Sequence, residues 1–173
     1  LMMLVVSEVS EADHGLEHNI NDDKLPHLPM FAVELADVSI RLFDMIGAEA
    51  SLYNGHIDYN YQEAFSNSLR DLSPSAFSRW VSFFPWIKNR RGGDTLKRMM
   101  SIINTVSAAM EHLRKGRTAE YRQKISEAQA ITFAVADLEG IDLFSIIQEK
   151  RDFNANRSDH KISNRAKDGG KKF

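Results

Sequence analysis

Four acidic residues near the start of the chain form two pairs with the same internal spacing. Glu8 and Glu11 are three positions apart, and so are Glu34 and Asp37. On an α-helix this spacing places both carboxylates of a pair on one face, about one turn apart. Each pair could therefore offer two carboxylates to a common ligand.

Clustered carboxylates repel one another unless something neutralises them. Two like charges 4 Å apart repel by about 4 kcal/mol at an effective dielectric constant of ~20, so such a cluster must protonate, separate or hold a cation. Magnesium suits open carboxylate ligands, because it keeps several waters and shares its coordination shell with substrate phosphates. The pattern predicts an Mg²⁺ site, in which Mn²⁺ could substitute, with four ligands: Glu8, Glu11, Glu34 and Asp37.

The ordinary alternative is that these acids line a solvated helix face, as Glu-x-x-Glu pairs usually do. The second pair is less ordinary, because the residues around it are apolar over most of the helix circumference. Such a helix is expected to be largely buried, with its narrow polar stripe facing a partner helix or a cleft. Within that stripe we expect Arg41 to pair with Asp44 or Glu34. The stripe consists of Glu34, Asp37, Arg41 and Asp44.

Zinc is a weaker candidate for this chain. There is no cysteine, and thiolates are common zinc ligands. His14 and His18 are four positions apart, but Gly15 between them indicates that the helix ends there. We therefore expect both histidines to be solvated loop residues.

The elements that carry these residues are predicted to be helices throughout. Strand signals are almost absent, so the fold class is all-α. Pro29 and Asp94 are suited to begin helices, and Gly116 and Gly140 to end them. The pattern predicts helices over about 1–17, 29–49, 58–71, 74–88, 94–115, 118–138 and 141–155.

Composition limits the classes of function. With 173 residues and 43% apolar content, the chain can form one substantial core, or two small helical units that share one. The formal charge of -2 indicates no general affinity for nucleic acid or anionic membranes. No window approaches the ~20 apolar residues of a membrane span, and no secretory signal is visible. Together with the lack of cysteine, this favours a cytoplasmic protein. The helical pattern opens at Leu1 without a capping residue, so we expect a preceding segment.

The chain also resembles itself. Residues 2–12 align with 99–109, and 34–47 align with 127–140, with a loop four residues shorter in the second copy. This predicts a degenerate tandem duplication, for which chance similarity between amphipathic helices is the alternative. The identical positions in the second alignment are Glu34 and Glu127, Asp44 and Asp137, and Gly47 and Gly140.

The two acidic pairs resemble the Glu-x-x-Glu, spacer, Glu-x-x-Asp signature of the all-α nucleoside triphosphate pyrophosphohydrolases, which include MazG-like proteins and dimeric dUTPases. The C-terminal region is similar to the Lys-x-x-x-Asn-x-x-Arg and Gly-Lys-rich ending of MazG-like proteins. The resemblance covers about 1–48 and 140–173. The C-terminal residues that carry it are Lys150, Asn154, Arg157 and the 168–173 segment with Lys171 and Lys172.

This resemblance implies a MazG-like bundle that hydrolyses a nucleoside triphosphate between its α and β phosphates, as a house-cleaning enzyme. The four acids would bind Mg²⁺, and one of the glutamates would serve as a base through a water. It also implies a homodimer or higher homo-oligomer. An ordinary solvated basic tail is the alternative for the last lysines. The candidates for neutralising the triphosphate are Lys150, Asn154, Arg157, Lys171 and Lys172.

The chain departs from the family in its middle, where about 90 residues intervene between Asp44 and Gly140. In the second copy, Thr105, Ala108 and Ala130 replace three of the acids, so that copy would be a scaffold half within a single domain. A catalytically silent nucleotide-binding or regulatory protein and a purely structural bundle remain alternatives. The expected regions are 1–49 (metal-binding helix pair), 50–93 (helical insertion), 94–140 (degenerate second pair) and 141–173 (C-terminal helix and basic tail).

Overall fold

The computed structural model describes residues 1–52 and 94–156. Within these ranges the regular structure is helical, without a strand, apart from an isolated bridge between Asn21 and Pro29. The predicted helices over 58–71 and 74–88 and the basic tail after Asn156 lie outside the described residues. The described helices are α1 (Met2–His18), α2 (Met30–Leu52), α6 (Thr95–Arg114), α7 (Thr118–Leu138) and α8 (Leu143–Asn156).

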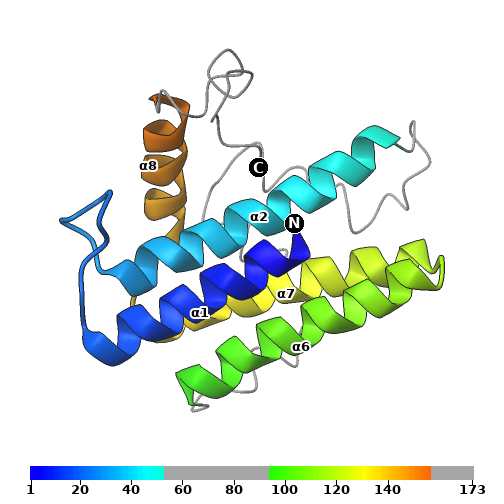
Figure 1. The fold of residues 1–173 in the computed structure, drawn as a ribbon, viewed down its shortest axis with the longest axis horizontal. Coiled ribbons are helices and arrows are strands. Elements are labelled where there is room, and N and C mark those ends of the chain that lie inside the picture. Colours follow the sequence, from blue (N-terminus) through cyan, green and yellow to red (C-terminus); the bar gives the residue numbers. More distant parts are fainter. Residues whose placement is uncertain (53–93, 157–173) are drawn as a thin grey trace, which may run out of the picture.

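Four of the helices form a bundle of two antiparallel hairpins (Figure 1). Helices α1 and α2 make the first hairpin, and α6 and α7 make the second. Helix α1 packs on α6 and α2 packs on α7, so the hairpins lie against each other. Helix α8 contacts α2 on the outside of the bundle and is steeply inclined to it in this view. Helix α2 is therefore the central element, because α1, α7 and α8 all pack against it.

Local chemistry explains where α6 begins and where α6 and α7 end. The side chain of Asp94 accepts a hydrogen bond from the Leu96 amide at 3.0 Å, which caps the first turn of α6. After α6 and α7 the chain turns through Gly116 and Gly140, whose φ angles of 69° and 67° favour glycine. The sequence-based predictions of these three boundaries are confirmed.

The core is built around α2. The prediction that this helix is largely buried is confirmed, because its apolar residues face α1, α7 and α8 at once. Burial of such side chains is the main favourable term in folding. The completely buried apolar residues of α2 include Val33, Leu35, Val38 and Leu42.

The helix expected over 1–17 is confirmed as α1, but the expectation that Gly15 places His14 and His18 in a loop is wrong. The helix continues to His18, and both His14 and His18 are exposed on it, with ring centroids 4.2 Å apart. Gly15 is needed for packing, because a Cβ at this position would lie 2.7 Å from the backbone nitrogen of Phe31. The glycine therefore lets α1 approach the start of α2 closely.

None of the described helices is both long enough and apolar enough to cross a lipid bilayer.

Candidate metal centre

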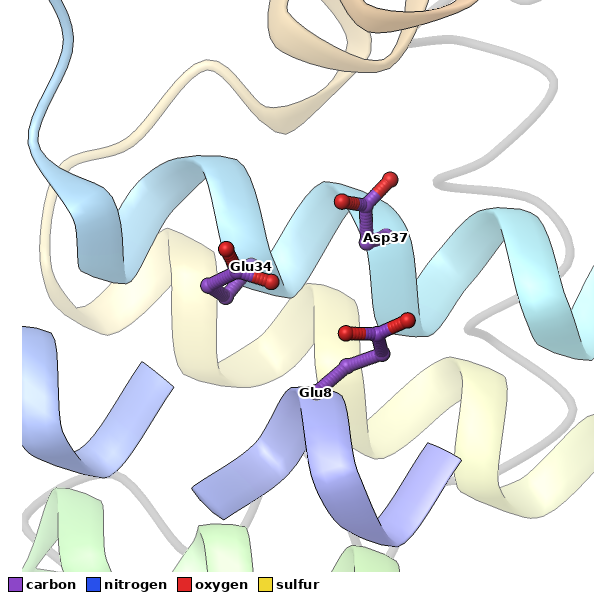
Figure 2. Close-up of side chains that lie close together, drawn as sticks. All are labelled: Glu8, Glu34 and Asp37. Atoms are coloured by element: carbon purple, nitrogen blue, oxygen red, sulfur yellow. The ribbon is translucent and has the colours of Figure 1, made fainter. Parts of the chain in front are cut away.

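Three of the four predicted acidic ligands lie together in the structure. Glu8 extends from α1 toward α2, which contributes Glu34 and Asp37 (Figure 2). One carboxylate oxygen of each residue lies within 4.8 Å of the other two. The hairpin of α1 and α2 therefore brings Glu8 close to two acids that are at least 26 residues away from it in the sequence.

The cluster is shielded from solvent. Glu34 is 3% exposed, and the side chains of Glu8 and Asp37 are 12% and 15% exposed. Burial, followed by the charge of Asp37, raises the pKa of Glu34 to about 8, although Lys150 lowers it. Burial and the charge of Asp37 also raise the pKa of Glu8, against the opposing effect of Arg41. Glu34 is therefore largely protonated at neutral pH unless a cation joins the cluster.

The fourth acid, Glu11, lies at the edge of this cluster. It is exposed and accepts a hydrogen bond from the Ser7 hydroxyl at 3.2 Å. It does not belong to the compact group of Glu8, Glu34 and Asp37. Its charge nevertheless contributes to raising the pKa of Glu8 and of Glu34, so it lies within electrostatic range.

Among the described residues, two basic side chains from different helices contact the cluster. The Arg41 Nε donates to Glu8 Oε1 at 3.3 Å, which joins α2 to α1. Arg41 was expected to pair with Asp44 or Glu34, so its partner across the hairpin was missed. From α8, the Nζ of Lys150 lies 2.8 Å from Asp37 Oδ2, in a side chain that is only 2% exposed. The sequence predicted that Lys150 helps to neutralise a bound triphosphate. It gave no signal for this ion pair with a predicted metal ligand.

Of the other candidates for triphosphate binding, the structure describes Asn154. Asn154 is half-buried on α8, one turn after Lys150, which puts the two side chains on the same face of that helix. The remaining three candidates lie outside the described residues: Arg157, Lys171 and Lys172.

The second hairpin offers no comparable acidic group among its described residues. Glu127, which aligns with Glu34, forms an ion pair with Lys124 at 2.6 Å on the same helix. Thr105 and Ala130 are buried at the positions that align with Glu8 and Asp37. The described acids that could hold a metal ion therefore come from the first hairpin alone.

The chemistry of the donor set fits a hard divalent cation. All three clustered groups are carboxylates, and oxygen ligands are those that Mg²⁺ and Mn²⁺ prefer. Such a cation would also favour the charged form of Glu34, which burial and the charge of Asp37 disfavour. Glu8, Glu34 and Asp37 could hold the ion, with Glu11 at the solvent side.

Comparisons of this chain with protein-family models, with curated proteins and with solved structures found no match. Apart from the motif resemblance, the structure is therefore the basis for assigning a function. It is an all-α bundle in which the described part has five helices, and its first hairpin brings three predicted ligands together.

Proposed function

We propose that the protein is a Mg²⁺-dependent nucleoside triphosphate pyrophosphohydrolase with a MazG-like helical bundle. It would cleave between the α and β phosphates to give a nucleoside monophosphate and pyrophosphate. One observation carries the proposal: the cluster of Glu8, Glu34 and Asp37 is assembled across α1 and α2 from the two motifs of the family signature.

The electrostatics of the cluster add support. A solvated helix face would leave each acid in contact with water, whereas Glu34 is 3% exposed and its pKa is raised to about 8. Burying ionisable carboxylates beside one another is costly, and perturbed groups of this kind gather at functional sites more often than elsewhere. A purely structural bundle gives no reason for this arrangement.

The roles of the residues follow from their positions. Glu8, Glu34 and Asp37 would hold the Mg²⁺, which when bound polarises phosphate oxygens and lowers the pKa of water. Glu11 is exposed at the edge of the cluster and has a carboxylate that can accept a proton from the attacking water. Lys150 and Asn154, one turn apart on α8, would donate hydrogen bonds to the triphosphate.

We also propose that α6 and α7 are a degenerate copy of α1 and α2. In support, both pairs are antiparallel hairpins, and α6 runs antiparallel to α1 as α7 does to α2 (Figure 1). Such a copy would act as the scaffold half of the bundle. The second hairpin would then replace a packing partner that a single-unit protein obtains by dimerisation.

The test is pyrophosphate release from a panel of canonical and modified nucleoside triphosphates with MgCl₂ present. Asp37→Asn is expected to lower turnover by at least about 100-fold, because it removes a ligand charge without changing size. Asp44→Asn is the matched control, since Asp44 is exposed on the same helix two turns later and lies outside the cluster. Equal rates for Asp37→Asn and the wild type, or no hydrolysis of any triphosphate, would overturn the proposal.

A second candidate is a nucleotide-binding protein without catalytic activity. The observation that favours it is the ion pair of Lys150 and Asp37, which neutralises one proposed ligand without a metal ion. This candidate predicts Mg²⁺-dependent nucleotide binding by calorimetry with no pyrophosphate release from the same panel.

A further inference from the structure

We infer that Lys150 is a built-in cation that competes with the divalent metal ion for Asp37 and thereby sets the affinity of the site. The inference rests on the proposed divalent site and adds a regulatory contact to it. The contact joins two helices, because Lys150 lies on α8 and Asp37 on α2.

The ammonium group of Lys150 is unusual in its surroundings. Its side chain is 2% exposed, and within the described part of the chain its Nζ makes no aligned hydrogen bond, although it lies 2.8 Å from Asp37 Oδ2. An ammonium group has three donors, and leaving donors unmade in a buried place is costly. Charge attraction to the acidic cluster is thus what holds Lys150 there.

A second lysine and carboxylate pair shows the contrast. Lys124 donates a hydrogen bond to Glu127 at 2.6 Å within α7, and its side chain is 32% exposed. That pair is local and partly solvated, so it contributes little to stability. Lys150 differs because its partner is a proposed metal ligand on another helix.

A dication that takes Asp37 Oδ2 as its ligand atom would have to replace the Lys150 ammonium, which lies 2.8 Å from that oxygen. Arg41, the other cation at the cluster, is 36% exposed, so water screens its charge. The charge of Lys150 is not screened in this way, because the side chain is buried. Binding of the metal ion therefore requires Lys150 to move away from Asp37, and the energy of that movement lowers the apparent affinity.

The test is calorimetric titration of the metal-free full chain with MgCl₂ alone. Lys150→Met keeps a long apolar stem without the charge, and it is expected to raise Mg²⁺ affinity by at least about tenfold. It should also lower the melting temperature without metal and enlarge the increase that MgCl₂ produces. Lys124→Met is the matched control and should bind Mg²⁺ as the wild type does. Lys150→Arg keeps the charge and should not gain affinity.

The outcomes separate this inference from the proposed function. If neither the wild type nor Lys150→Met binds Mg²⁺, the divalent site itself is wrong. If the wild type binds Mg²⁺ and Lys150→Met binds it equally or more weakly, Lys150 has only a structural role and the inference is overturned.

Hydrogen exchange of the wild type keeps the inference testable if Lys150→Met does not fold. Saturating MgCl₂ should accelerate exchange of the α8 amides, because Lys150 leaves its contact with α2, while α6 amides serve as the internal reference. Unchanged or slower exchange in α8 on Mg²⁺ binding would contradict the competition.

Discussion

At the scale of single residues, Glu34 would couple proton binding to the proposed binding of a metal ion. Its carboxyl group is buried on α2 close to those of Glu8 and Asp37. Without a cation the group keeps its proton, whereas a divalent ion would favour its charged form. The same side chain therefore decides how the apoprotein responds to pH.

The first prediction concerns the stability of the metal-free protein against pH. The pKa of Glu34 is about 8 in the folded protein, against an ordinary value of 4.5. Between these values the folded state holds a proton that the unfolded state has released, so stability falls as pH rises from about 4.5 to about 8. The slope for one proton is at most about 1.4 kcal/mol per pH unit. Urea unfolding at several pH values, with a chelator present, measures this slope of the free energy of unfolding against pH.

Glu34→Gln should remove most of this slope, because the amide does not titrate. A smaller slope of the same sign is expected to remain from Glu8, whose pKa is also raised. A wild-type protein whose stability is flat over this range, or a variant that keeps the full slope, would show that Glu34 is not the group responsible.

The second prediction concerns Gln129, a core residue on α7. Its side chain is completely buried, and neither its Oε1 nor its Nε2 has a hydrogen-bond partner among the described residues. Unsatisfied buried polar groups cost about 1–3 kcal/mol. Gln129→Met should therefore raise the free energy of unfolding by about 1 kcal/mol or more. Gln123→Met on the exposed side of the same helix is the control and should change it by less than about 0.5 kcal/mol. A destabilised Gln129→Met would indicate that the amide has a role the core does not explain.

At the scale of elements, much of the fold could be predicted from the sequence. The helices expected over 118–138 and 141–155 correspond closely to α7 and α8, because apolar periodicity and the glycine between them, Gly140, are local signals. Gly15 was misread because a glycine that ends a helix and a glycine that admits a neighbouring helix look the same in one sequence. Only the approach of Phe31 distinguishes them.

The third prediction compares two helical glycines. Gly15→Ala should destabilise the fold by about 1–3 kcal/mol, since the added Cβ would lie 2.7 Å from the Phe31 nitrogen and force α1 and α2 apart. Gly47→Ala on α2 should stabilise it by about 0.5–1 kcal/mol, because nothing lies within 4 Å and alanine favours a helix. Thermal unfolding of both variants measures the difference. The same sign of change for both would refute the close-packing role of Gly15.

At the scale of the whole molecule, the candidate site depends on contacts that the sequence could not indicate. The acidic pairs were visible as motifs, but their approach depends on how the hairpin of α1 and α2 closes. The contact of Lys150 with Asp37 joins residues more than 100 positions apart, and such pairing follows from packing. Helical periodicity shows which face of a helix is apolar but does not identify the partner of a polar side chain.

The fourth prediction is that the two hairpins unfold as one unit, because α1 packs on α6 and α2 packs on α7 around a common core. Ile102 on α6 is completely buried, so Ile102→Ala should cost about 2–5 kcal/mol. Hydrogen exchange should show that loss in the most protected amides of α1 and α2 as well as in those of α6 and α7. Met100→Ala, at a position that is 48% exposed, is the control and should leave exchange nearly unchanged. A loss confined to α6 and α7 would mean that the first hairpin is stable without the second, and that the second hairpin does not support the candidate site.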